Sequence, residues 1–173
     1  NYDLIEFGGG VMADYAYDLL LGIQQAKDSA GERFASDKSY VARRDAFLAL
    51  IADMDVLKGT NLNFRLGKWT QEARDAASEV VGAASATADW YEYNNARTLI
   101  TTWGDKVQNG GLKDYSYRSW QGLLKDYYLP RWEYYFANGC TGCDYFFFEW
   151  NWAHGKEHFV GQAAKSDVTL VPG

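Results

Sequence analysis

Two cysteines and two histidines near the C-terminal end of the chain are the residues whose types and spacing best suit a metal ion. Cys140 and Cys143 are separated by two residues, and His154 and His158 follow in the next segment. Thiolates and imidazoles in this order are ligands of tetrahedral zinc sites. The ten residues between Cys143 and His154 are fewer than the roughly 12–15 of the standard zinc finger. The alternative, which the sequence favours, is a loop whose cysteines form a disulfide or remain free.

The two histidines also fit the H-x-x-E-H order of one class of zinc peptidase, with Glu157 as the catalytic base. That motif needs a rigid helix to hold both imidazoles on one face, and Gly155 lies inside it. No third ligand is identifiable in the sequence. We therefore expect two solvent-facing histidines near the end of a helix.

Carboxylates among aromatic residues are the other candidates for chemistry. Glu92, Asp114, Glu133 and Glu149 have aromatic neighbours in the sequence, and burial among such residues raises the pKa of a carboxyl group toward the range of a general acid. A glycosidase needs two carboxyls about 5–9 Å apart, and no spacing here requires this. Asp114 is more simply a helix N-cap, and Glu133 and Glu149 are more simply partners of Arg97 or Arg131. We expect no catalytic residue, no metal and no cofactor in this chain.

Composition limits the partners of the protein. The chain has 173 residues, which fits one domain, and its 47% hydrophobic and 23% charged residues are typical of a globular protein. A net charge of −6 without a cluster of lysine and arginine argues against nucleic acid as a partner. No apolar run approaches the roughly 18 residues of a membrane span. No signal peptide is visible, and because the chain begins with asparagine we interpret it as a fragment or a mature product.

The elements that must position these residues are predicted to be helices. Only two prolines occur, which favours long helices over a sheet with many turns. The first three helices are expected over residues 3–28, from Asp37 or Ser36 to Gly59, and over 69–80. A fourth should run from Ser85 or Thr87 to Gly104, and a fifth from Asp114 to Phe136 with a break or kink at Pro130. The sixth is expected over 145–159. The predicted fold is all-α, a single bundle of about six helices, with a weakly structured tail over 160–173.

The first predicted helix contains three consecutive glycines, Gly8, Gly9 and Gly10. Each costs about 1 kcal/mol relative to alanine within a helix. They either bend the helix or let another element approach it closely. The buried face of this helix is predicted to carry Leu4, Val11, Tyr15, Leu19 and Ala26.

Aromatic residues concentrate between Trp90 and Phe136, together with Arg97 and Arg131. Aromatic surface with a few polar groups is typical of a wall that faces a sugar or a partner protein. It is equally typical of a bulky core, and composition alone does not separate the two.

Two segments of this aromatic region make the pattern specific. They read NNARTLITTWG over residues 94–104 and LKDYSYRSWQGLLKDYYLPRWEYYF over 112–136. These blocks resemble the C-terminal helical domain of the α-N-acetylglucosaminidase family of glycoside hydrolases, family 89. DLIEF at residues 3–7 and FRLGKWTQEARDAA at 64–77 are similar to the same family. The resemblance extends to about residue 160.

The resemblance implies a secreted, lysosomal or periplasmic exo-glycosidase that removes terminal α-linked N-acetylglucosamine with retention. Its catalytic glutamates would lie on a central barrel domain that is absent from this chain. The helical domain would pack on that barrel and help to form the wall of the substrate pocket. The expected partners are therefore the barrel domain of the same polypeptide and a glycan that ends in N-acetylglucosamine, and the isolated chain is expected to be inactive.

The resemblance also implies roles for individual residues. Trp103 would present its ring to the sugar, and Leu112 and Tyr115 would line the same rim. Structural roles are expected for Arg97, Asp114, Arg131 and Trp132.

The cysteine turn is not part of the family pattern. Cys140 and Cys143 are therefore candidates for a disulfide rather than for zinc. The alternative function is a stand-alone helical interaction module stapled by a disulfide or by zinc at these two cysteines.

Overall fold

The computed structural model of the chain describes residues 1–82, 84–97, 102–103, 113–114 and 118–138. The described part contains five α-helices: α1 (Tyr2–Ala30), α2 (Lys38–Gly59), α3 (Leu66–Val81), α4 (Ala86–Arg97) and α5 (Leu129–Asn138). Shorter elements are the 3₁₀ turns η1 (Gly31–Ser36) and η2 (Leu62–Phe64), the π-helical turn η3 (Leu124–Tyr128), and the two-residue strands β1 (Thr102–Trp103) and β2 (Lys113–Asp114). The predicted all-α fold is confirmed, and the sixth predicted helix lies outside the described residues.

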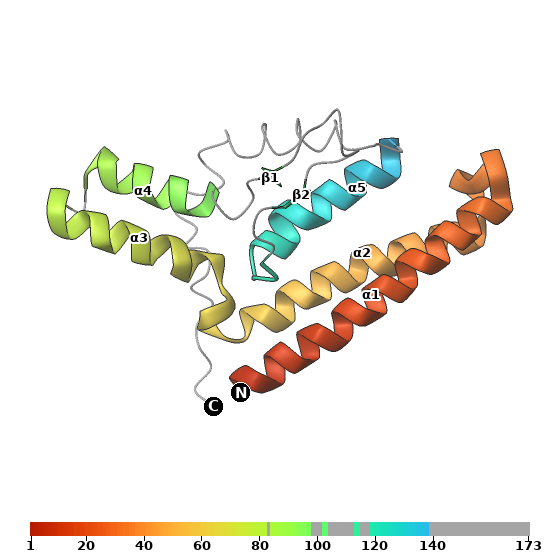
Figure 1. Ribbon diagram of the computed structural model, residues 1–173, viewed down its shortest axis with the longest axis horizontal. Coiled ribbons are helices and arrows are strands. Elements are labelled where there is room, and N and C mark those ends of the chain that lie inside the picture. Colours follow the sequence, from red (N-terminus) through yellow and green to blue (C-terminus); the bar gives the residue numbers. More distant parts are fainter. Residues whose placement is uncertain (83, 98–101, 104–112, 115–117, 139–173) are drawn as a thin grey trace.

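The helices form two antiparallel pairs and one covering helix. α1 and α2 lie side by side along the length of the molecule, and α3 and α4 form a second, shorter pair (Figure 1). α5 follows η3 and packs on α2. Within the described residues, no helix is both long enough and apolar enough to span a membrane.

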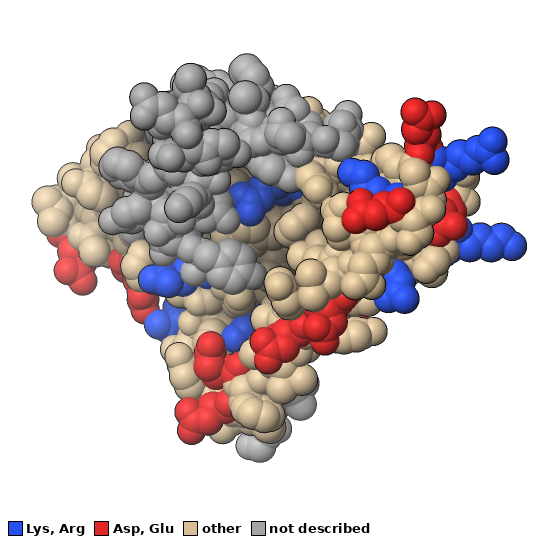
Figure 2. Space-filling view, turned by 45° about the vertical axis from the view of Figure 1, so that its right-hand side comes forward, with Lys and Arg blue, Asp and Glu red and all other residues tan. Residues whose placement is uncertain are grey.

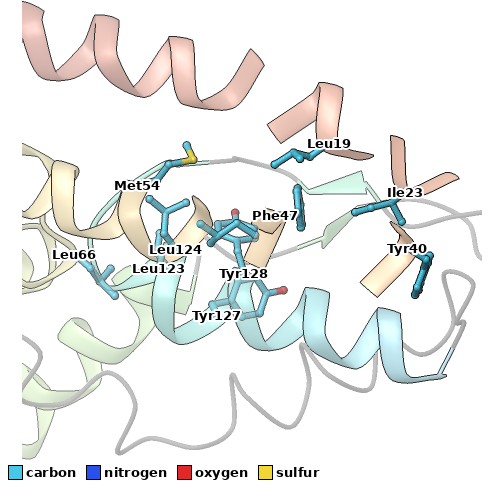
Figure 3. Close-up of a cluster of buried hydrophobic side chains, with 11 residues drawn as sticks. Leu19, Ile23, Tyr40, Phe47, Met54, Leu66, Leu123, Leu124, Tyr127 and Tyr128 are labelled. Atoms are coloured by element: carbon cyan, nitrogen blue, oxygen red, sulfur yellow. The ribbon is translucent and has the colours of Figure 1, made fainter. Parts of the chain in front are cut away.

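The core lies where α1, α2, η3 and α5 meet (Figure 3). Phe47 of α2 is at its centre, with its ring edge-on to Trp132 of α5 at 5.0 Å between centroids. Leu19 and Ile23 of α1 are buried against this cluster. The other buried members are Tyr40, Ile51, Met54, Leu66, Leu123, Leu124, Tyr127 and Tyr128.

The starts of α2 and α4 follow their predicted caps. The carboxylate of Asp37 accepts hydrogen bonds from the backbone N–H groups of Ser39 and Tyr40, each at 2.9 Å. The hydroxyl of Ser85 accepts one from the N–H of Thr87 at 3.1 Å. These bonds satisfy N–H groups that have no acceptor within the first turn of a helix.

The glycines of α1 allow a close approach and do not interrupt the helix. α1 is continuous through them, and an added Cβ at Gly9 would come within 2.8 Å of the Lys58 side chain of α2. A Cβ added at Gly8 would lie 3.3 Å from the Leu57 side chain. Lys58 is buried by this contact and lies over the Phe64 ring, 4.4 Å from its centroid.

We expect Gly9→Ala to be less stable than Gly10→Ala by about 1–2 kcal/mol, because its methyl group displaces the buried Lys58 side chain and this cost offsets the gain in helix propensity. Gly10→Ala is the matched control, since nothing lies within 4 Å of its added Cβ. That control should raise the stability by up to about 1 kcal/mol through helix propensity. Urea unfolding of both variants measures the difference, and equal effects would contradict the close-approach role of Gly9.

Three predictions about the elements are wrong. The buried face of α1 carries Ile5, Gly9, Leu19, Gly22 and Ile23, whereas the predicted Leu4, Val11 and Tyr15 are exposed. The fourth helix does not continue to Gly104, because residues 102–103 form a strand that pairs with residues 113–114.

Asp114 does not cap a helix. It lies in β2, paired with Thr102, and the helical segment that follows starts only near Leu123. Pro130 lies in the first turn of α5, directly after the π-helical turn, at a position where the missing N–H of proline is tolerated.

Candidate functional site

The antiparallel pair β1–β2 contains the residue predicted to face a sugar. Trp103 pairs with Lys113 and Thr102 pairs with Asp114. The backbone at Trp103 is therefore fixed by a partner ten residues away in the sequence. Leu112 and Tyr115, the other predicted pocket residues, directly flank β2 but lie outside the described residues.

The helix that leads toward β1 is held by a partly buried ion-pair cluster. Arg74 of α3 donates to Glu92 of α4 at 3.2 Å, and it also donates to Asp89. The hydrogen bond to Asp89 is the largest cause that raises the pKa of Arg74 above its ordinary value. Because Glu92 is buried, this arginine provides the positive charge that a buried carboxylate requires. α4 is thereby held on α3.

The segment that follows β2 is also held on α3. The N–H of Gln121 donates to the carbonyl of Phe64 at 2.8 Å, and the N–H of Leu66 donates to the carbonyl of Gln121 at 3.0 Å. The rings of Trp69 and Trp120 pack beside this bridge, 5.6 Å apart. Both sides of the β1–β2 pair therefore connect to segments anchored at α3.

A buried carboxylate of α2 completes this anchor. Oδ1 of Asp55 accepts hydrogen bonds from the N–H of Gly122 at 2.7 Å and from the N–H of Lys125 at 3.1 Å. Burial raises the pKa of Asp55, and the two hydrogen bonds partly offset that increase. Gly122 has a φ of +93°, which favours glycine, and an added Cβ there would lie 3.3 Å from Leu66. Asp55 thus caps the start of η3 from another helix.

The predicted structural residues lie in different parts of the fold. The guanidinium of Arg131 stacks over the rings of Tyr127 and Tyr128, at 5.3 and 5.0 Å from their centroids. Trp132 packs against the core through Phe47. Arg97 is the last residue of α4, and its side chain lies outside the described part of the structure.

The cysteines and histidines of the C-terminal segment lie outside the described residues. These are Cys140, Cys143, His154 and His158, so the disulfide between Cys140 and Cys143 stays a prediction. Elsewhere in the described part of the chain, no three histidine, cysteine, aspartate or glutamate side chains are grouped as a metal site requires.

The predicted carboxylates are not brought together in the described residues. Glu92 is paired with Arg74, Glu133 is exposed on α5, and Asp114 lies in β2. Glu149 lies outside the described residues. Among the residues that the structure describes, the carboxylates of Asp89 and Glu92 do converge, and both are ion-paired with Arg74.

Sequence reasoning missed the anchoring groups Asp55 and Arg74. One signal was present for Asp55, because a carboxylate lies directly beside Met54 on the apolar face of its helix. A charged residue at such a position needs a hydrogen-bonding partner from another element.

A cavity of about 240 Å³ lies between α1, α2 and α5. Its lining is mainly apolar and includes Tyr17, Phe47, Met54, Tyr128, Arg131 and Trp132. None of the described residues that line it is a carboxylate. The described part of its lining therefore offers no acid and base for glycoside hydrolysis.

Comparison with known proteins identifies the family. The model of the alpha-N-acetylglucosaminidase (NAGLU) C-terminal domain matches residues 1–171. The human alpha-N-acetylglucosaminidase is 30% identical over 129 residues, which cover 68% of this chain and 16% of the human protein.

Solved structures agree with this assignment. A family 89 glycoside hydrolase from Clostridium perfringens in complex with PUGNAc has a TM-score of 0.69 and 30% identity, covering 88% of this chain and 17% of that one. A variant from the same organism, in complex with its substrate GlcNAc-alpha-1,4-galactose, has a TM-score of 0.68 and 29% identity, with the same coverage of both chains.

The chain thus spans about a sixth of the length of these relatives, and its matching region is their C-terminal domain. The ordered motifs over residues 94–136, the helical fold and the match across nearly all residues agree with one another. This chain belongs to the family of alpha-N-acetylglucosaminidase C-terminal domains.

Proposed function

We propose that this chain is the C-terminal helical domain of a retaining, exo-acting glycosidase that hydrolyses terminal α-linked N-acetylglucosamine. The observation that carries the proposal is the match of residues 1–171 to the family of these C-terminal domains. In this proposal the catalytic carboxylates belong to the larger part of the polypeptide. The helical domain packs on that part and supplies a section of the pocket wall.

The scaffold around β1–β2 supports a role in the wall of the pocket. The segments on both sides of the pair are anchored on α3, through Arg74 on one side and through Gln121 on the other. A wall that orients a sugar needs such rigid support, since a small displacement of a contact weakens catalysis strongly. Trp103 suits this task because the apolar face of a sugar stacks on an aromatic ring.

The proposal predicts which part of the polypeptide is catalytically active. The 173-residue chain alone should not hydrolyse an aryl α-N-acetylglucosaminide, because the proposal assigns both catalytic carboxylates to the larger part of the polypeptide. The full polypeptide that carries this domain should hydrolyse it, and NMR of the first product should show retained anomeric configuration. Turnover by the isolated chain at the rate of the full enzyme, or an inverted product, would contradict the proposal.

A further inference from the structure

A glutamate lies on the buried side of α4. Of the α4 side chains that the structure describes, those of Ala88 and Glu92 are buried, and they lie four residues apart on one face of the helix. α4 has 12 residues, and a helix of that length is only marginally stable without tertiary contacts. It lies along α3 (Figure 1), so the contacts that Glu92 makes with α3 help to decide where α4 sits.

One guanidinium of α3 holds α4 at two points. Nη1 of Arg74 donates to Oε2 of Glu92 at 3.2 Å, and it also donates to Oδ1 of Asp89. The two carboxylates are three residues apart, so they are neighbours on one side of α4. Two directional contacts to the same group fix both the rotation of α4 and its position along α3.

Stability alone does not explain a glutamate at this position. The side chain of Glu92 is 2% exposed, whereas those of Arg74 and Asp89 are 25 and 33% exposed. Removing a carboxylate from water is costly, and an apolar residue of similar volume is often as stable or more stable at a buried position. The charged group instead specifies one geometry, because hydrogen bonds are directional and apolar packing is not.

α4 leads into the strand that carries Trp103. The helix ends at Arg97, five residues after Glu92, and β1 begins at Thr102, another five residues along the chain. On the other side of the strand pair, Gln121 is hydrogen-bonded to the backbone at the start of α3. The position of α4 along α3 therefore sets where β1 meets its partner strand.

We infer that Glu92 is a positioning residue for the wall of the pocket. Through Arg74 it fixes α4 on α3, and through α4 it sets the place of β1 and of Trp103. Glu92 itself does not touch the substrate. This inference rests on the proposed function, because it takes Trp103 to face the sugar. Its effect on the reaction comes from orientation, since a displacement of about 1 Å at a substrate contact lowers the rate strongly.

The test compares Glu92→Leu with Glu79→Leu in the full polypeptide. Leucine has nearly the volume of glutamate, and Arg74 keeps Asp89 as a partner in the first variant. Glu79 is an exposed carboxylate of α3 and gives the matched control. Glu92→Leu should lower kcat/KM for an aryl α-N-acetylglucosaminide by at least about tenfold, with a melting temperature within about 3 °C of the wild type. The control should stay within about twofold in kcat/KM.

Two further variants keep the test decisive. Glu92→Gln retains an oxygen that accepts from Arg74, so it should recover most of the activity. If Glu92→Leu lowers the melting temperature by more than about 5 °C, Arg74→Met/Glu92→Leu takes its place, because it removes both charges of the pair. A normal kcat/KM in the stable leucine variant would overturn the inference.

Combination with Trp103→Ala distinguishes positioning from a general loss of structure. If Glu92 acts through Trp103, Glu92→Leu/Trp103→Ala should have the kcat/KM of Trp103→Ala alone, within about twofold. A wall that has lost its ring cannot be made worse by displacing it. A kcat/KM lowered by the product of the two separate effects would overturn the inference.

A measurement that needs no catalysis separates this inference from the proposed function. Hydrogen exchange of the full polypeptide, read by mass spectrometry, reports the opening of the β1–β2 pair. The peptide that contains Thr102 and Trp103 should exchange at least about threefold faster in Glu92→Leu than in Glu79→Leu. Faster exchange in a polypeptide that does not hydrolyse the aryl substrate would support the positioning and contradict the function. Equal exchange in an active polypeptide would overturn the positioning and leave the function intact.

Discussion

Asp55→Ala is expected to lower the free energy of unfolding by about 3 kcal/mol. The substitution removes the acceptor of two backbone N–H groups, those of Gly122 and Lys125. A buried donor left without a partner costs about 1–3 kcal/mol. The loss of the buried charge offsets part of that cost. Because Asp55 joins α2 to the start of η3, the effect should appear as a lower urea midpoint for the whole cooperative transition.

Two matched variants separate the hydrogen bonds from other effects. Asp55→Asn keeps an oxygen at the accepting position and should stay within about 1 kcal/mol of the wild type. Asp53→Ala removes an exposed carboxylate from the same helix and should change stability by less than about 0.5 kcal/mol. If Asp55→Asn were as unstable as Asp55→Ala, the capping role of Asp55 would be wrong.

The raised pKa of Asp55 gives a pH dependence with a definite sign. Burial makes the folded protein bind the Asp55 proton more tightly than the unfolded chain does. The contribution of this proton to stability is therefore fully present below the ordinary value of 3.8 and is lost as the pH rises through the raised folded pKa. Asp55→Asn lacks this titration, so its stability relative to the wild type should increase between pH 4 and pH 7. Urea unfolding at both pH values measures the change.

Helix positions in this protein were predictable because local signals agree with the tertiary structure. The cap at Asp37 and the apolar repeat of Phe47, Ile51 and Met54 both follow from short-range chemistry. Phe47, Ile51 and Met54, which this repeat places on one face of the helix, are all buried. Where local propensity, capping and burial point to one answer, sequence reasoning is reliable.

The face of α1 was mispredicted because the helix has two apolar sides. Leu4, Val11 and Tyr15 give a regular repeat, and so do Ile5, Gly9, Met12 and Leu19. Periodicity detects both stripes and cannot tell which one packs inside the domain. The choice is made by the close approach of Lys58 to Gly9, which is a contact between distant parts of the chain.

The candidate site was less predictable than the helices because contacts between distant parts of the chain determine its structure. The strand at Trp103 exists through pairing with Lys113, and the cap of η3 comes from Asp55, 67 residues before Gly122. Asp114 followed by an apolar repeat has the local pattern of a helix start, yet this residue pairs with Thr102 instead. Non-local pairing of this kind overrides local propensity and leaves no signal in a short window of sequence.

In the full polypeptide, Trp103→Ala is expected to lower kcat/KM for an aryl α-N-acetylglucosaminide by about 10–100-fold, equivalent to about 1.4–2.7 kcal/mol. Loss of a stacking surface removes binding energy from the ground state and the transition state alike. The decrease should therefore appear mainly as a higher KM. Trp103→Phe keeps an aromatic face and should recover most of the loss.

Trp90→Ala is the matched control for this prediction, because Trp90 lies on α4 and is 55% exposed. Its removal deletes an equally large ring near the surface without affecting β1, and kcat/KM should stay within about twofold of the wild type. A folded Trp103→Ala enzyme with unchanged kcat/KM would exclude Trp103 from the pocket. If Trp103→Ala instead lowered the melting temperature of the isolated chain by more than about 5 °C, the ring would be a core residue of this domain. An increase in KM with an unchanged melting temperature would show that the Trp103 ring stacks on the sugar. A ring outside the pocket would leave KM unchanged, and a core ring would lower the melting temperature, because only a ligand contact alters binding without altering the fold.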